Sequence, residues 1–229
     1  MVSRYPLLLA LLLGVSACAT EPQAAASDAA SASPASAATA TEAPPAPATL
    51  QPAALGKPAP AFELPTLDGG KVSLAAHRGK VVVLEWFNPD CPFVNQAHLE
   101  GNLKGLAKKH PEVVWIAINS NAAGKQGHEP ERNRAGRERF GIDYPIALDA
   151  DGAVGKAYGA TRTPEIYVID PEGNLVYRGA LDSTSGGDLA DQPDAKNYVE
   201  MALEDLAEKR PLREAETKAW GCSVKYGSS

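Results

Sequence analysis

The sequence predicts an α/β fold, with a central mixed sheet flanked by helices, in the part of the chain after residue 54. The first observation is the nearly continuous apolar run Val81–Phe87, which is typical of a strand buried on both faces. The second is that further strand patterns alternate with helical ones, a succession that indicates helices packed on a sheet. The 175 residues from 55 to 229 are enough for one domain with a substantial core.

The strands are predicted from short apolar or β-branched runs that end at turn residues. The expected strands are Ala61–Leu64, Val81–Phe87, Val113–Asn119, Glu165–Ile169 and Leu175–Tyr177. Asp68–Gly70 and Asp170–Asn174 carry the Asp, Gly, Pro and Asn residues that favour chain reversal, so we expect hairpins there.

The helices are predicted from apolar residues at helical spacing or from dense charge. The expected helices run from Pro92 to about Lys109, over Glu131–Phe140 and over Ala195–Arg210. Gly101 and Gly105 weaken the first of these, and we expect a kink. The second carries four arginines among acids and is expected to be a solvated face.

Residues 1–17 have the layout of a secretory signal, because Arg4 precedes the apolar run Leu7–Leu13 and small residues follow. The run is too short to span a bilayer as a permanent helix. The segment Val15–Cys18 resembles the lipobox of bacterial lipoproteins, which implies cleavage before Cys18 and lipidation of its thiol. Plain secretory cleavage is the alternative. The lipoprotein family's sorting rule, applied to Ala19, implies the outer membrane.

The segment 18–54 is expected to be a disordered tether that follows the lipidated cysteine. After Cys18 it consists mainly of Ala, Pro, Ser and Thr, with three charged residues and no aromatic one. Such a composition buries too little apolar surface to offset the entropy of ordering. Residues 55–229 would then form a domain in the cell envelope that faces the periplasm.

The net charge gives no sign of a nucleic-acid-binding surface. The chain has a charge of −6 at pH 7, and loss of residues 1–17 removes Arg4 and no acid, which gives −7. An acidic balance without a basic stripe argues against nucleic acid as a partner.

The most reactive candidate side chain is Cys91, which follows an Asn-Pro-Asp turn and precedes Pro92 at the expected start of a helix. Unpaired N–H groups and the positive end of the helix dipole favour a thiolate there. Cys222, on a tail beyond the last helix, is the other cysteine left once Cys18 is acylated. We expect the tail to be flexible enough to reach Cys91, and an oxidising envelope favours a disulfide between the two.

A family resemblance adds to this interpretation. Gly56–Leu64 (GKPAPAFEL) and Gly79–Leu84 (GKVVVL) resemble the opening of the redoxin branch of the thioredoxin superfamily, which includes the alkyl hydroperoxide reductase/thiol-specific antioxidant proteins. The resemblance implies a thioredoxin-like fold with Cys91 as the nucleophile. Thr163-Pro164 resembles the cis-proline loop, so Pro164 is expected to lie against the active cysteine.

Further site residues follow from the same resemblance. Glu85 falls where thioredoxins keep a buried acid for proton transfer, with a locally hydrogen-bonded glutamate as the alternative. Asn88 stands where peroxiredoxins carry Thr or Ser before the peroxidatic cysteine, and its amide can donate a hydrogen bond. Val94 replaces the second cysteine of a C-x-x-C motif, so no disulfide can form within that helix turn.

The predicted function is that of a thiol oxidoreductase, peroxiredoxin-like and antioxidant, with Cys91 as nucleophile and Cys222 as resolving cysteine. The alternative is a non-enzymatic binding or scaffold module in which these two cysteines form a permanent disulfide. A third interpretation is that Cys222 is a free thiol. The expected partners are a peroxide or a protein thiol or disulfide, an unknown thiol reductant, and a membrane through the lipid anchor. No cofactor is expected, nor a metal, because a copper-binding C-x-x-x-C motif would need a cysteine at Asn95.

Overall fold

The computed structural model describes residues 50–186 and 191–228. The expected signal at 1–17, the acylated Cys18 and nearly all of the tether lie outside the described residues. Within the part that is described, no helix combines the length and the apolar character needed to cross a membrane.

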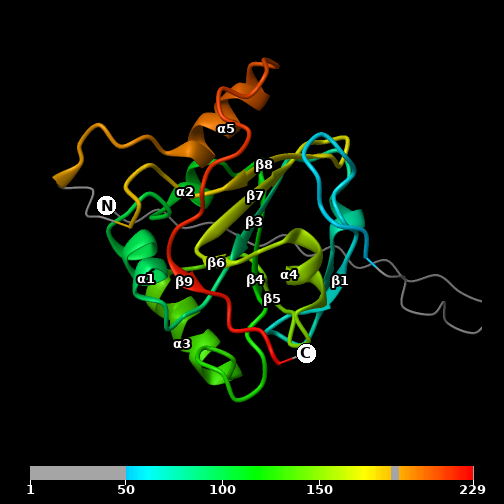
Figure 1. Ribbon diagram of the computed structural model, residues 1–229, viewed down its shortest axis with the longest axis vertical. Coiled ribbons are helices and arrows are strands. Elements are labelled where there is room, and N and C mark those ends of the chain that lie inside the picture. Colours follow the sequence, from blue (N-terminus) through cyan, green and yellow to red (C-terminus); the bar gives the residue numbers. More distant parts are fainter. Residues whose placement is uncertain (1–49, 187–190, 229) are drawn as a thin grey trace, which may run out of the picture. The chain divides into compact units, whose positions relative to one another are not determined.

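A mixed five-stranded sheet with the strand order β5-β4-β3-β7-β8 forms the centre of the domain (Figure 1). Its strands are β3 (Val82–Trp86), β4 (Val114–Asn119), β5 (Ile146–Leu148), β7 (Glu165–Ile169) and β8 (Leu175–Gly179). Strands β3, β4 and β5 pair in parallel, whereas β7 and β8 are antiparallel to their neighbours. The predicted central strand and the hairpin around Asp170–Asn174 are therefore confirmed.

Short paired strands lie outside this sheet. The hairpin predicted around Asp68–Gly70 joins β1 (Glu63–Pro65) to β2 (Lys71–Ser73), and a 3₁₀ turn follows at Leu74–His77. A second two-stranded pair joins β6 (Arg162–Thr163) to β9 (Cys222–Ser223).

Successive side chains of β3 contribute to different packing clusters, as strand alternation requires. Leu84 and Trp86 belong to one hydrophobic cluster, in which the Trp86 ring lies 4.8 Å, centroid to centroid, from that of Tyr167. Val83 belongs to a second cluster, and Phe87 to a third that includes the reactive candidate Cys91. A strand buried along its whole length gives the turn that follows it a rigid base.

Helices cover the sheet, and the first predicted one is broken in two. The helices are α1 (Pro92–Leu99), α2 (Leu106–Lys109), α3 (Pro130–Phe140), α4 (Ala153–Tyr158) and α5 (Tyr198–Ala207). Instead of a kink, the chain leaves the helix after Leu99 and re-enters it after Gly105, which has a φ of +71°. That left-handed conformation is disfavoured for residues with a Cβ, so the glycine marks the break. Helix α4 and strand β5 had no sequence prediction.

The C-terminal segment is not a flexible tail, contrary to our expectation. It crosses the domain beside α1 and β6 as the red trace in Figure 1. Before Cys222 the indole of Trp220 donates to the carbonyl of Asp182 at 3.0 Å, and after it the N–H of Val224 donates to Thr161 at 3.0 Å. Backbone pairing and these bonds fasten the cysteine on both sides.

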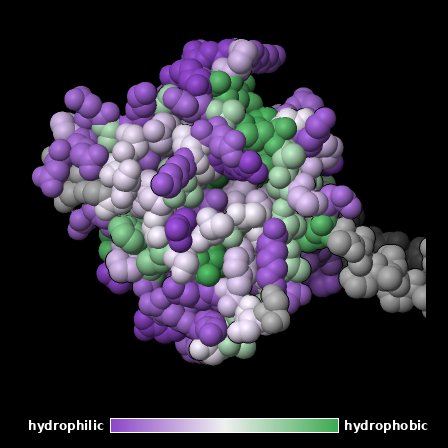
Figure 2. Space-filling view, in the orientation of Figure 1, coloured by the Kyte–Doolittle hydropathy of each residue, from purple (hydrophilic) through white to green (hydrophobic). Residues whose placement is uncertain are grey.

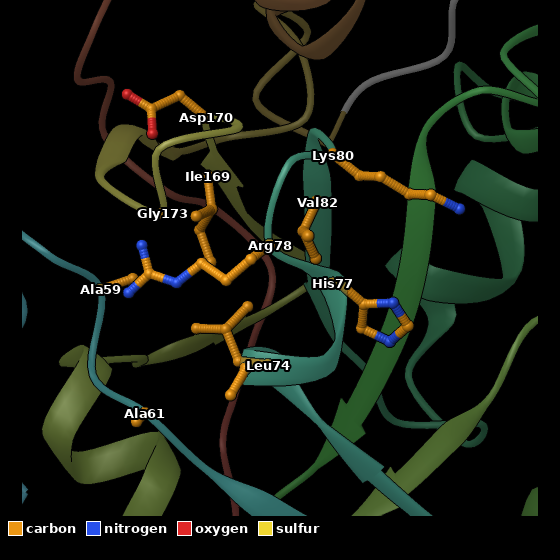
Figure 3. A pocket seen from close by; sticks show the side chains of 11 residues that line it. Ala59, Ala61, Leu74, His77, Arg78, Lys80, Val82, Ile169, Asp170 and Gly173 are labelled. Atoms are coloured by element: carbon orange, nitrogen blue, oxygen red, sulfur yellow. The ribbon is translucent and has the colours of Figure 1, made fainter.

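The visible surface is mixed in polarity (Figure 2), and a small crevice lies near the start of β3. Figure 2 shows hydrophilic and weakly hydrophobic residues mixed over the visible face, with hydrophobic residues gathered beside α5 and β8. A small crevice lies where β3 begins and β7 ends, and Arg78 extends across it between Ala59 and Gly173 (Figure 3). Because Cys91 follows the other end of β3, the crevice is remote from the thiols.

Candidate functional site

Cys91 is placed by the turn that connects β3 to α1. Its N–H donates to the carbonyl oxygen of Asn88 at 3.1 Å, and the residue forms the N-cap of α1 with Pro92 as the first helical residue. Proline suits that position because it has no N–H to satisfy. The helix therefore begins at the thiol, as predicted.

The Cys91 side chain is completely buried, with 0% of its surface exposed. It packs in one cluster with Phe87 and Val94, and its Sγ donates to the carbonyl oxygen of Thr163 at 3.1 Å. The peptide bond between Thr163 and Pro164 is cis. The structure thus brings the cis-proline loop, which the sequence pointed to, directly against the thiol.

Cys222 lies opposite Thr163 in the antiparallel pairing of β6 with β9. Its partly buried side chain packs against the cluster that contains Cys91, and in the described residues both cysteines are free thiols. Burial raises the pKa of Cys222 to about 11, and the neighbouring Cys91 thiol adds to the rise. The two cysteines that the sequence analysis paired therefore meet, through backbone pairing rather than through a mobile arm.

A titration experiment follows from the raised pKa of Cys222. Below about pH 11 its thiolate fraction should rise about tenfold with each pH unit. Because the thiolate is the attacking species, disulfide formation from an oxidised Cys91 should accelerate as the pH rises from about 7 to 9. Stopped-flow fluorescence after one equivalent of oxidant would measure this step, and a flat profile would contradict the assignment of Cys222 as the attacking thiol.

Gly221 allows the close approach of β9 to β6. Its φ is +118°, and a Cβ at this position would lie 2.2 Å from the carbonyl oxygen of Thr163. The neighbouring Trp220 ring packs against Phe93 of α1 at a centroid distance of 5.9 Å. A glycine before Cys222 is thus required by space and by backbone conformation together.

Glu85 is buried in the middle of β3 and is hydrogen-bonded through both carboxyl oxygens. Its Oε1 lies 2.9 Å from Nε2 of His98, and its Oε2 accepts a bond from the Tyr144 hydroxyl at 3.2 Å. Burial and the neighbouring Glu85 raise the pKa of Tyr144 well above its usual range. Glu85 could be predicted as a site residue from the sequence. Its partners His98 and Tyr144 could not, because they are 13 and 59 residues away along the chain.

Asn88 and Asp90 shape the turn around the thiol. Asn88 Oδ1 accepts the N–H of Asp90 at 2.9 Å, and its Nδ2 is directed at the carbonyl oxygen of Gln126 at 3.5 Å. Arg132 forms an ion pair with Asp90, which offsets an acid next to the thiol. The Asn88 side chain therefore braces the turn, and its donation toward a peroxide or a thiolate stays a prediction. An open depression beside the turn is lined by Pro89, Asp90, Pro92, Asn95, Gln126, Arg132 and Arg139.

The described residues contain no group of three or more His, Cys, Asp or Glu side chains arranged to hold a metal ion. The site itself holds two neighbouring thiols, a cis-proline loop and, in β3, a buried carboxyl group.

Comparison with known proteins agrees with this geometry. Residues 54–199 match the family model described as Redoxin. Over 124 residues the chain is 32% identical to the thiol-disulfide oxidoreductase ResA of Geobacillus thermodenitrificans, covering 53% of this chain and 67% of that protein. Over 138 residues it is 30% identical to a Mycobacterium tuberculosis protein named as a peroxiredoxin, covering 53% and 81%.

A solved structure shows the same fold. An uncharacterized conserved protein from Geobacillus kaustophilus superposes with a TM-score of 0.68 at 32% identity, covering 77% of this chain and 94% of that one. The predicted thioredoxin-like α/β fold is thereby confirmed. The family model spans most of the described domain, including the turn at Cys91 and the loop at Pro164. The chain therefore belongs to the Redoxin family.

Proposed function

We propose that this protein is a thiol-disulfide oxidoreductase of the cell envelope in which Cys91 and Cys222 form the redox couple. The observation that carries the proposal is that Cys222 pairs with Thr163, whose carbonyl oxygen accepts the Cys91 thiol, and packs against the Cys91 cluster. The 32% identity to a named thiol-disulfide oxidoreductase supports the same reaction class. We assign Cys91 as the nucleophile, because it caps the N-terminus of α1, the position that the thioredoxin resemblance gives to the attacking cysteine.

The reaction with a disulfide substrate proceeds in two exchanges. The Cys91 thiolate attacks one substrate sulfur, the substrate S–S bond breaks, and the other sulfur leaves as a thiolate. Cys222 then loses its proton and attacks Cys91 in the mixed disulfide, which releases the second substrate thiolate. Two electrons have moved to the substrate, and the protein holds the Cys91–Cys222 disulfide.

A thiol reductant restores the couple by attack on the more accessible sulfur. Cys222 is partly exposed, whereas Cys91 is completely buried. An incoming thiolate therefore forms its mixed disulfide with Cys222, and Cys91 leaves as the thiolate. A second thiol of the reductant then releases Cys222, so that one dithiol is oxidised for each protein disulfide reduced.

A peroxide is the second candidate oxidant, favoured by the 30% identity to a protein named as a peroxiredoxin. Attack of the Cys91 thiolate on the peroxide breaks the O–O bond and gives a sulfenic acid and a water or alcohol. Cys222 then condenses with the sulfenic acid, forming the disulfide and releasing water. The burial of Cys91 favours a small oxidant over a bulky one.

Three further residues complete the proposed site. Pro164 shapes the loop whose Thr163 carbonyl receives the thiol, and Asn88 braces the turn that precedes it. Glu85 is the proton acceptor, since it is the carboxyl group buried in β3 two residues before Phe87 of the thiol cluster. We assign the signal at 1–17 and lipidation of Cys18 to anchorage in the outer membrane, with the domain facing the periplasm.

Mapping the disulfide tests the proposed function. Reduced protein treated with one equivalent of hydrogen peroxide, or with a disulfide-bonded test protein, should yield a Cys91–Cys222 cross-linked peptide. Peptide mapping without reductant detects the link, and a dithiol should remove it in repeated cycles. In Cys222→Ser, Cys91 should instead form a dimedone adduct or advance to sulfinic acid.

The fastened C-terminal segment favours one competing function, a scaffold with a permanent disulfide. The reduction potential of the Cys91–Cys222 disulfide distinguishes the enzyme from the scaffold, because the potentials of structural disulfides typically lie below about −300 mV. If dithiols do not reduce the Cys91–Cys222 disulfide and neither oxidant modifies reduced Cys91, the protein is a scaffold and not an enzyme.

A further inference from the structure

Glu85, His98 and Tyr144 form a buried titratable cluster at the interface of β3 and α1. The side chains of Glu85 and His98 are 1% and 4% exposed. Both carboxyl oxygens are hydrogen-bonded, one to the imidazole and the other to the Tyr144 hydroxyl. Because burying an unpaired carboxylate is costly, these partners allow the acid to occupy the core.

His98 connects this acid to the helix that bears the nucleophile. Cys91 caps the N-terminus of α1, and His98 lies in the last turn of the same eight-residue helix. The His98 ring stacks on Phe140 at a centroid distance of 5.1 Å and an interplanar angle of 12°. The bond between Glu85 and His98 therefore fixes α1, and with it Cys91, against the central strand.

A narrow crevice borders the cluster. Its lining includes His98, Phe140 and Tyr144. The charged groups that face it are Lys108 from α2 and Asp143 from the segment before β5. Two members of the cluster, His98 and Tyr144, thus stand between the buried carboxyl group and water.

Of these two side chains, the histidine is the one that can pass a proton on. Burial and the charge of Glu85 raise the pKa of Tyr144, so its hydroxyl stays protonated and acts as a fixed donor. An imidazole has two ring nitrogens, one of which can accept a proton while the other donates one. Its Nε2 already contacts Glu85, and its ring lines the crevice.

We propose that His98 is a positioning residue that holds Glu85 and carries protons between its carboxyl group and water in the crevice. The inference rests on the proposed thiol-disulfide function. When the two thiols become a disulfide, two electrons pass to the substrate disulfide, and two protons reach its sulfurs through water. The Cys91 proton leaves when its thiolate forms, and the Cys222 proton leaves as Cys222 attacks the mixed disulfide. Glu85 takes up the Cys222 proton and His98 transfers it to water, which protonates the departing substrate thiolates; reduction by a dithiol reverses the path.

The variant His98→Gln tests the proposal through a pH profile. The ratio of variant to wild-type rates for disulfide reduction by dithiothreitol cancels the ionisation of the reagent. We expect His98→Gln to be slower by about 10–100-fold near pH 7 and to change the shape of the rate ratio against pH. Tyr144→Phe should keep the wild-type shape. His110→Gln is the matched control, because His110 lies beside Glu112 and Glu200 rather than beside Glu85.

A purely structural His98 would lower the melting temperature and leave the shape of the profile unchanged, and that result would overturn the inference. If His98→Gln does not fold, the test is made on the wild-type protein by ¹⁵N NMR of the His98 imidazole. The His98 nitrogen shifts should then differ between disulfide and dithiol forms near pH 7, and identical shifts would refute the proposal. Failure of the wild-type thiols to cycle would instead refute the proposed function.

Discussion

Gly221→Ala is expected to slow formation of the Cys91–Cys222 disulfide by about 100-fold, because a displacement of about 1 Å between reacting groups can cost that much. The added Cβ would lie 2.2 Å from the Thr163 carbonyl oxygen, at a φ of +118° that alanine rarely adopts. Strand β9 must move away from β6, and Cys222 moves with it. Stopped-flow measurement after oxidation of Cys91 gives the rate.

Gly227→Ala is the matched control for this substitution. It lies in the same C-terminal segment, and its added Cβ would meet the Ala122 Cβ at an ordinary 3.4 Å. We expect its disulfide to form at the wild-type rate. If Gly221→Ala also formed the disulfide at that rate, the close β6–β9 pairing would not be what brings the two thiols together.

Glu85→Gln is expected to leave the fold intact and to slow turnover by about 10²–10⁴-fold, the usual contribution of general acid–base catalysis. Glutamine keeps the size of the side chain and can still bond to His98 and Tyr144, but it cannot take up the proton. Steady-state reduction of a disulfide-bonded substrate measures the loss, and near-UV circular dichroism reports on the fold.

An exposed glutamate provides the control for this change. Glu63→Gln removes a carboxylate that pairs with Lys71 at the surface, where ion pairs contribute little to stability. Its turnover should equal that of the wild type. Wild-type kinetics in a well-folded Glu85→Gln protein would assign Glu85 to structure and would leave proton transfer to another group.

The strands and the position of Cys91 at a helix start could be predicted from local sequence. The apolar run at Val81–Phe87 indicated the central strand because only a doubly buried strand tolerates so few polar residues. The turn residues before Cys91 and the proline after it indicated a helix start at the thiol. Both signals are local, since hydrophobic periodicity and backbone preference act within a few residues of the chain.

The break between α1 and α2 could not be predicted in detail from the local sequence. Gly101 and Gly105 indicated weakness but not whether the helix would bend or end. In the structure a Cβ at Gly101 would lie 2.8 Å from the Cα of Ala97, so the path that the chain takes after α1 requires a glycine there.

By itself the sequence determined the fold class, the Redoxin resemblance and the position of Cys91 at a helix N-terminus. Each of these depends on residues that are neighbours along the chain. Only the tertiary structure decided the rest. Cys222 meets Cys91 through pairing with Thr163, and Glu85 meets His98 through the packing of α1 on β3. The physical reason is that such contacts join residues far apart in the sequence, and their geometry is set by backbone pairing and core packing rather than by local spacing.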